Sequence, residues 1–238
     1  MGEAVLSVAG LEPSGEAGLL VDLWVFREHG LRGFGVASAL TAQRGEAQVL
    51  GVPPPLFEAQ LRSLPRPAAV KTGMLWGAEL AEILAEFVKK WRAPLVVDPV
   101  LVSSEGLKLH KDGLAEAIKV HLLPLTWVFT PNAPEAEKFL GRPVRDTFQA
   151  RAAAEELLQL GPKVVLLKGG HLPEPVDVIA HRGGVLLLRH PRGPERRGTG
   201  CALASAVAAR LAMGREAAEA ALEGALWTLR HYIGLGSP

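Results

Sequence analysis

The chain has 238 residues, 48% of them hydrophobic, and its 26 basic and 25 acidic residues give a formal net charge of +1. This length can bury one sizeable core, so we expect a single domain over residues 1–238, and the balanced charge indicates neither nucleic acid nor a membrane surface as partner. The single cysteine, Cys201, excludes an intrachain disulfide, and no signal peptide or spanning segment is evident, so we expect a cytoplasmic protein with a small-molecule partner.

Short runs of Val, Leu and Ala alternate with longer helical patterns along the chain. This alternation is typical of repeated βαβ units, and it predicts an α/β fold with a mostly parallel sheet. The predicted strands are Val5–Ala9, Gly35–Leu40, Ala69–Thr72, Leu95–Asp98, Trp127–Thr130, Val164–Lys168, Val176–Ala180 and Val185–Arg189, the last two forming a hairpin. The predicted helices are Glu16–His29, Pro55–Ser63, Gly77–Trp91, Lys111–His121, Pro134–Leu140, Phe148–Leu160, Gly200–Met213 and Arg215–Tyr232.

Most predicted strands end in a short cluster of Gly, Pro, Asp, Asn or Lys. These clusters are Gly10–Gly18, Lys71-Thr72-Gly73, Asp98-Pro99, Thr130-Pro131-Asn132 and Lys168-Gly169-Gly170-His171. Ligands of open parallel sheets bind beyond the carboxyl ends of the strands. We therefore expect these clusters to line one crevice.

The strongest local signal is the turn Gly198-Thr199-Gly200-Cys201, which opens an apolar helix. Glycines let successive N–H groups converge, and the helix adds its positive end, so this turn could hold a phosphoryl group in flight. The helix N-terminus is also expected to lower the pKa of the Cys201 thiol and to make a thiolate available as a base. The alternatives are an ordinary glycine-rich helix entry and a buried cysteine that only packs.

Other polar residues at strand ends have both a functional and a structural interpretation. Lys168 offers a cation for a polyphosphate, although a lysine at a strand end is often only solvated. Asn132 and Glu135 are placed to cap a helix, and this explanation competes with Mg²⁺ binding through Glu135. Asp98 could face a ligand or metal-bound water, or it could simply end its strand.

Several enzyme classes lack their motifs here. The chain contains no G-x-x-x-x-G-K-[ST], so it is not a P-loop enzyme. It contains neither G-x-S-x-G nor H-E-x-x-H, which removes support for a serine hydrolase or a zinc peptidase. The glycine turn at Gly198 lacks the last glycine of the dinucleotide fingerprint and stands too late in the chain.

Taken in order, these segments resemble the hydroxymethylpyrimidine and phosphomethylpyrimidine kinases of thiamine synthesis, a branch of the ribokinase-like superfamily. The resemblance extends from Ala9 to Ala209. It is carried by Ala9-Gly10, Pro13-Ser14-Gly15, Ala17-Gly18, Ala39-Leu40-Thr41-Ala42-Gln43, Lys71-Thr72-Gly73-Met74, Asp98-Pro99-Val100, Thr130-Pro131-Asn132, Glu135-Ala136-Glu137, Lys168-Gly169-Gly170-His171-Leu172 and Gly198-Thr199-Gly200-Cys201. Each segment is weak alone, but the ordered set is specific.

The resemblance implies a three-layer α/β/α sandwich that uses ATP and Mg²⁺ to phosphorylate the hydroxymethyl group of a small heteroaromatic alcohol, and it is compatible with a homodimer. It implies that Cys201 takes the hydroxyl proton while the turn Gly198-Thr199-Gly200 and Lys168 stabilise the transferred phosphate. The implied substrate-binding residues are Gly10, Ala17, Asp22, Gln43 and Met74. The implied nucleotide-binding residues are Asn132, Lys168, Gly170 and Thr199. The residues implied to organise Mg²⁺ are Asp98 and Glu135.

The chain departs from the family pattern at three places. The family usually has G-[ST]-D-x-S-G-G-A-G near the start, whereas this chain has Leu11 and Glu12 and replaces a glycine with Glu16. Before the glycine turn the family usually has His, and here Arg197 takes that place. These departures keep two alternatives open: a pyridoxal or pyridoxine kinase, and a non-catalytic pyrimidine-binding protein on the same scaffold.

Overall fold

The computed structural model describes residues 4–43, 47–102, 106, 108–193 and 196–234. Within these residues it contains one sheet of nine strands in the order β3-β2-β1-β4-β5-β6-β7-β8-β9, which confirms the α/β prediction. The strands are β1 (Ala4–Leu11), β2 (Arg32–Ala42), β3 (Gln48–Gly51), β4 (Ala69–Thr72), β5 (Leu95–Val97), β6 (Thr126–Phe129), β7 (Val164–Leu167), β8 (Val176–His181) and β9 (Gly184–Arg189).

The central strands β2, β1, β4, β5, β6 and β7 run parallel, as the alternating pattern predicted. Strands β8 and β9 form the predicted hairpin, with Val178 opposite Leu187. Strand β3 was not predicted from the sequence. It has only four residues before a proline-rich segment, and it is held by antiparallel pairing with β2, where Leu40 lies opposite Leu50. A strand this short carries little periodicity of its own.

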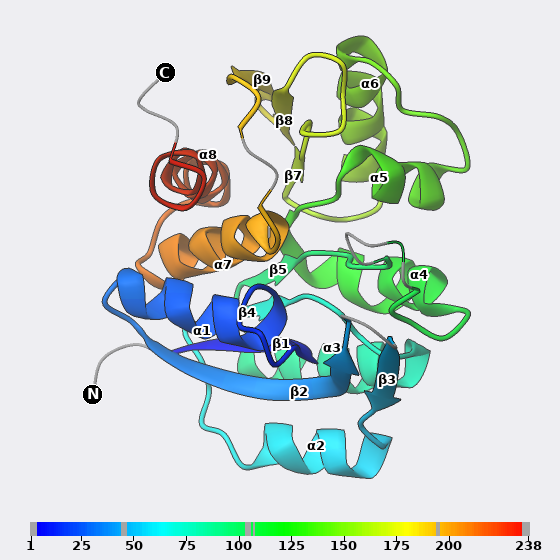
Figure 1. Cartoon of the computed structure of the whole chain (residues 1–238), viewed down its shortest axis with the longest axis vertical. Helices are drawn as coiled ribbons and strands as arrows, with labels where there is room; N and C mark the ends of the chain where they lie inside the picture. Colours follow the sequence, from blue (N-terminus) through cyan, green and yellow to red (C-terminus); the bar gives the residue numbers. More distant parts are fainter. Residues whose placement is uncertain (1–3, 44–46, 103–105, 107, 194–195, 235–238) are drawn as a thin grey trace.

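Helices cover both faces of the sheet, which gives the predicted three layers (Figure 1). On one face lie α1 (Gly18–Glu28), α7 (Thr199–Ala212) and α8 (Ala217–Trp227). On the other face lie α2 (Pro54–Arg62), α3 (Ala78–Trp91), α4 (Leu114–Ala117), α5 (Ala133–Leu140) and α6 (Thr147–Leu158). No helix among the described residues is long and apolar enough to cross a membrane.

Two predicted helices were too long. The helix predicted over Lys111–His121 begins only at Leu114, because Gly113 precedes it in the left-handed region at φ +85°. It continues as a π-helical turn over Ile118–Leu122. The last predicted helix ends its α-helical part at Trp227 and closes with a second π-helical turn.

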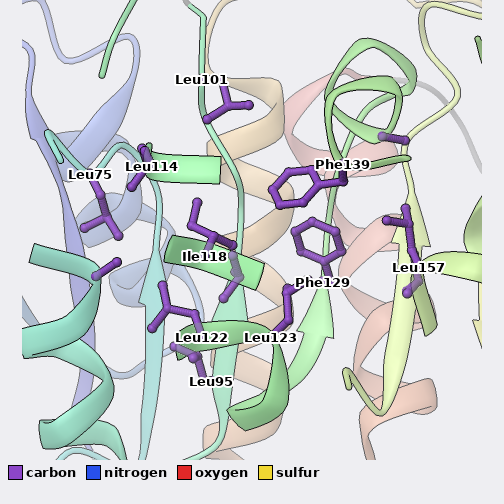
Figure 2. Packing of buried hydrophobic residues seen from close by; sticks show 14 of the residues in the cluster. Leu75, Leu95, Leu101, Leu114, Ile118, Leu122, Leu123, Phe129, Phe139 and Leu157 are labelled. Carbon is purple, nitrogen blue, oxygen red and sulfur yellow. The ribbon is translucent and has the colours of Figure 1, made fainter. Parts of the chain in front are cut away.

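The core is divided by the sheet, because successive residues of a strand face opposite sides. In β1, Val5 packs toward α7 and α8, whereas Leu6 and Val8 pack toward the helices of the other face. Figure 2 shows part of the cluster that contains Leu6 and Val8. In this cluster the ring of Phe129 in β6 meets the ring of Phe139 in α5 edge to face, with 5.2 Å between the ring centroids. Burying each such side chain contributes about 1.5–3 kcal/mol, so the strands that end at the polar clusters are firmly held.

The stripe predicted on the helix after the glycine turn faces the core as expected. Leu203, Val207 and Leu211 of α7 are all buried against the sheet. This packing fixes α7 with its N-terminus at the carboxyl edge of β1, β4 and β5, the edge where the polar clusters lie.

Candidate active site

A pocket of about 150 Å³ opens at the carboxyl edge of the parallel strands. Pockets for drug-sized ligands measure about 300–1,000 Å³, so this one suits a single small ring. The predicted site residues that line it are Gly10, Ala17, Gln43, Met74, Asp98, Asn132, Glu135, Lys168, Gly198, Gly200 and Cys201. Four of the five predicted strand-end clusters therefore contribute to one crevice, whereas Lys71, Thr72 and Gly73 do not line it.

One side of the pocket is apolar and tightly packed. Met74, only 5% exposed, lies against Gly10 so closely that a Cβ on that glycine would come 2.7 Å from the Met74 sulfur. Leu109 packs against Met74, and Val100 also lines the pocket. A flat ring would find apolar contact on this side.

The amide of Gln43 is one of the polar groups in the pocket lining. Its Nε2 donates to Thr41 Oγ1 at 3.1 Å, and its Oε1 accepts a hydrogen bond from Arg197 Nη2. Gln43 follows the end of β2, whereas Arg197 stands directly before the glycine turn. The two departures Arg197 and Glu12 both line the pocket, and Glu12 is almost fully buried there beside Ser14.

Another part of the pocket lining is a cluster of charged side chains. Lys168 Nζ lies 2.7 Å from Asp98 Oδ1 and 3.8 Å from Glu135 Oε2. Burial lowers the pKa of Lys168, but the two carboxylates outweigh burial and raise it, so the side chain stays protonated. Burial, opposed by Lys168, raises the pKa of Glu135 to about 7. The site therefore holds a permanent cation and two carboxyl groups within reach of each other.

These residues fit Mg²⁺, which prefers oxygen ligands and usually keeps several waters while it bridges to substrate phosphates. Asp98 and Glu135 supply carboxylate oxygens, and Asn132 adds an amide beside them. No group of three metal-ligating side chains occurs among the residues that the structure describes. One or two carboxylates are enough for an ion that is held mainly by water and a nucleotide.

Asn132 and Glu135 also form the capping box that the sequence suggested. Asn132 Oδ1 accepts from the Glu135 N–H at 2.8 Å, and Glu135 Oε2 accepts from the Asn132 N–H at 2.8 Å. The capping interpretation is therefore confirmed. Because both residues also line the pocket, capping does not exclude a second role there.

The glycine turn is held by close backbone contacts. Gly198 caps α7 at φ +77°, and a Cβ on it would come 2.1 Å from the Glu16 carbonyl oxygen. A Cβ on Gly18 would likewise meet the Gly10 carbonyl oxygen at 2.3 Å. A Cβ on Gly200 would lie 3.2 Å from Lys168 Nζ, which places the N-terminus of α7 directly beside that cation.

The expected low pKa of Cys201 is wrong. Although the residue occupies the first turn of α7, burial raises the pKa of its thiol to about 11, and the nearby Lys71 only partly opposes this effect. The loss of hydration of the thiolate raises the pKa of Cys201 more than the positive end of the helix lowers it. Cys201 therefore carries its proton near neutral pH when no substrate is bound.

Asp22 does not line the pocket, contrary to expectation. Its side chain is fully buried and lies 2.8 Å from Lys71 Nζ, and it accepts hydrogen bonds from Ser7 and Ser205. Spacing along α1 could not reveal this, because the fully buried Lys71 of β4 attracts the carboxylate inward. The sequence placed Lys71 in one of the strand-end clusters, but it did not show that Asp22 is the partner of Lys71.

Two other predicted site residues, Thr199 and Gly170, do not line the pocket. Thr199 turns its hydroxyl to the Arg196 carbonyl at 2.6 Å, which closes the turn. Gly170 is exposed, and its carbonyl accepts from Arg192 at 2.8 Å. Glu16, one of the departures from the family pattern, lines a neighbouring hollow with Trp24 and Tyr232.

Comparisons with known proteins identify the family. The model of the phosphomethylpyrimidine kinase family matches residues 12–233. A hydroxymethylpyrimidine/phosphomethylpyrimidine kinase of Streptomyces coelicolor is 42% identical over 219 residues, which cover 89% of this chain and 81% of that protein.

Two solved structures share the fold. The phosphomethylpyrimidine kinase of Clostridium difficile is 34% identical with a TM-score of 0.83, covering 97% of this chain and 99% of its own. The pyridoxal kinase of Staphylococcus aureus in complex with AMP-PCP is 29% identical with a TM-score of 0.90, covering 98% of this chain and 89% of its own. The ribokinase-like fold predicted from the ordered motifs is thus confirmed. The chain belongs to the phosphomethylpyrimidine kinase family and is a phosphotransferase.

Proposed function

We propose that the chain transfers the γ-phosphoryl group of ATP to the hydroxymethyl group of 4-amino-5-hydroxymethyl-2-methylpyrimidine, and then to the resulting monophosphate, in thiamine synthesis. The observation that carries this proposal is the pocket itself. It joins an apolar ring-sized side with the Gln43 amide to a charged side with Lys168 and the glycine turn. A small alcohol held at one side would direct its hydroxyl toward a phosphate at the other.

The polar groups have distinct roles in this proposal. Gln43 and Gly10 hydrogen-bond the ring, while Ala17 and Met74 pack on it. Asn132, Gly170 and Thr199 contact the nucleotide, and Lys168 neutralises its phosphates. Asp98 and Glu135 would hold Mg²⁺ through water, and the ion would supply charge neutralisation for the phosphates.

In the transfer step, the substrate oxygen forms a bond to the γ-phosphorus while the bond from that phosphorus to the β-phosphate oxygen breaks, releasing ADP. Phosphoryl transfer depends mainly on positioning and on stabilising the charge of the phosphoryl oxygens. The N–H groups of Gly198 and Gly200 and the Lys168 ammonium are suited to that task, whereas the Thr199 N–H would first have to leave the Arg196 carbonyl, to which it donates at 3.4 Å. They carry the larger part of the rate enhancement in this proposal.

The hydroxyl proton leaves as the new bond forms, and the proposed acceptor is Cys201. Because burial keeps this thiol protonated near neutral pH, Cys201 would first release its own proton to solvent through the pocket that it lines, and the resulting thiolate would then accept the hydroxyl proton. We therefore expect Cys201→Ala to lower kcat more than it weakens ATP binding. An unchanged kcat would remove the cysteine from the mechanism and leave the glycine turn and Lys168 in place.

Pyridoxal or pyridoxine is the competing substrate, since kinases of that kind share the fold. The decisive experiment incubates the full chain with ATP, Mg²⁺ and a panel of hydroxymethyl heterocycles, and follows ADP release and product mass. We expect turnover of the aminopyrimidine alcohol with a higher kcat/KM than for pyridoxine. No turnover at millimolar alcohol would overturn the proposal, and tight pyrimidine binding without turnover would favour a non-catalytic binding protein. A cytoplasmic location and a homodimer stay predictions.

A further inference from the structure

A series of hydrogen bonds fixes the direction of the Gln43 amide, and two of its members, Gln43 and Arg197, line the pocket. Arg197 Nη2 donates to Gln43 Oε1. Gln43 Nε2 donates to Thr41 Oγ1 at 3.1 Å, and Thr41 Oγ1 donates in turn to the Leu11 carbonyl at 3.3 Å. Within this series of hydrogen bonds, each group is either the donor or the acceptor toward the next group.

Arg197 determines the donor-to-acceptor direction of these hydrogen bonds. A guanidinium group has only donors, whereas an amide can turn over and exchange its oxygen and nitrogen. If the Gln43 amide turned over, its NH₂ group would face the Arg197 donors, and the bond between them would be lost. The Thr41 hydroxyl is a weaker constraint, because a hydroxyl can both donate and accept.

The fixed amide presents a defined pattern to a ligand in the pocket. A primary amide has two N–H groups and two oxygen lone pairs, so after its bonds to Thr41 and Arg197 the Gln43 amide retains one N–H on Nε2 and one lone pair on Oε1. The complementary ligand edge has an acceptor next to a donor. A 4-aminopyrimidine carries this pair, a ring nitrogen beside an exocyclic amino group, whereas pyridoxine has no amino group beside its ring nitrogen.

We propose that Arg197 is a specificity-determining residue: it acts through Gln43 and selects rings that carry an amino donor beside a ring-nitrogen acceptor. The inference rests on the proposed function for the placement of the ring at Gln43. Arg197 is well placed for this task, because its carbonyl accepts from the Tyr232 hydroxyl at 3.0 Å and its backbone leads directly into the glycine turn. Its side chain thereby connects the ring side of the pocket with the phosphate side.

The test compares three substitutions that differ in hydrogen-bonding capacity. Arg197→Lys keeps a side chain that only donates, Arg197→Gln can donate or accept, and Arg197→Met can do neither. We expect the Lys variant to keep the wild-type preference for the aminopyrimidine alcohol over pyridoxine. We expect the Gln and Met variants to lower the ratio of the two kcat/KM values by about tenfold or more. Arg182→Met, at the exposed β8–β9 turn, is the matched control.

The KM values for ATP and for the aminopyrimidine distinguish an effect of Arg197 on the ring from an effect on the phosphate turn. The KM for ATP should change by less than about twofold in all three variants, whereas the KM for the aminopyrimidine should rise in the Gln and Met variants. A preference that is the same in the Lys, Gln and Met variants would overturn the inference. A parallel rise of both KM values would also overturn it, because Arg197 would then act at the phosphate turn.

Calorimetric binding of the two alcohols without ATP makes the test independent of turnover. If the wild type binds the aminopyrimidine but transfers no phosphate, the proposed function fails, and the ratio of binding constants in the variants still decides the role of Arg197. If the wild type binds pyridoxine as tightly as the aminopyrimidine, the selectivity inference is wrong even where both are phosphorylated. Thermal unfolding of every variant identifies any that misfold, and Arg197→Gln stands in for Arg197→Met if the latter does.

Discussion

Lys71 Nζ lies 2.8 Å from Asp22 Oδ2, and both side chains are fully buried. The carboxylate also accepts from Ser7 Oγ at 2.5 Å and from Ser205 Oγ at 2.8 Å. These four residues come from β4, α1, β1 and α7, so one buried polar cluster ties two strands of the sheet to two helices that cover it.

Removal of one partner of this buried pair should be costly. Asp22→Ala leaves the Lys71 ammonium buried without its counter-charge, and we expect the free energy of unfolding to fall by about 3–5 kcal/mol. Urea unfolding measures the change. Glu86→Ala is the control, because it breaks the exposed pair of Glu86 with Lys89 and should cost about 0–1 kcal/mol. Equal losses in the two variants would show that the buried pair contributes no more than a surface pair.

The Cys201 thiol should titrate well above a free cysteine. Its pKa is raised by burial from an ordinary 9.0 to about 11, so alkylation by iodoacetamide should reach half its limiting rate near pH 11. The folded chain holds this proton more tightly than the unfolded chain. The resulting stabilisation is therefore present below pH 9 and is lost as the pH rises toward 11. A midpoint below pH 8.5 would show that the helix N-terminus dominates after all.

Gly198→Ala should abolish most phosphoryl transfer. The left-handed backbone costs a non-glycine residue about 1–2 kcal/mol, and the new Cβ would also overlap the Glu16 carbonyl, which forces the turn to move. Gly214→Ala is a suitable control: that glycine has φ +82° but no heavy atom within 4 Å of the new Cβ. Comparable kcat and melting temperature in the two variants would argue against a tightly held turn.

Asn132→Asp tests separately the two roles given to Asn132, which are capping of α5 and binding of the nucleotide. Asp caps a helix as well as Asn does, so the free energy of unfolding should change by less than about 0.5 kcal/mol. The added negative charge would face the nucleotide phosphates, and we expect the KM for ATP to rise about tenfold. An unchanged KM, with stability retained, would restrict Asn132 to capping.

Local patterns predicted what depends on neighbours in the sequence. The β1 run and the stripe of Leu203 and Val207 on α7 were found because their side chains recur at the strand or helix period. The glycine turn was recognised from its own residues, Gly198-Thr199-Gly200-Cys201, and from the apolar helix that follows them. Neither inference needed the position of any distant residue.

The remaining features depend on which segments meet in space. Asp22 has the spacing of an ordinary helical residue, and only Lys71 of β4 draws it away from the pocket. The pKa of Cys201 depends on how much protein covers it, and β3 exists only because β2 pairs with it. The Arg197–Gln43 bond joins residues 154 positions apart, although the unusual arginine before the glycine turn had marked that place.

The close approaches of Gly18 to the Gly10 carbonyl and of Gly198 to the Glu16 carbonyl are contacts between main-chain atoms. Only a substitution at one of these glycines would directly change this main-chain spacing. In the proposed reaction, the separation between the ring and the phosphate would therefore be kept by any folded variant that retains them. Adaptation of this scaffold to a new alcohol would then depend on the side chains that line the pocket, among them Glu12, Gln43 and Arg197.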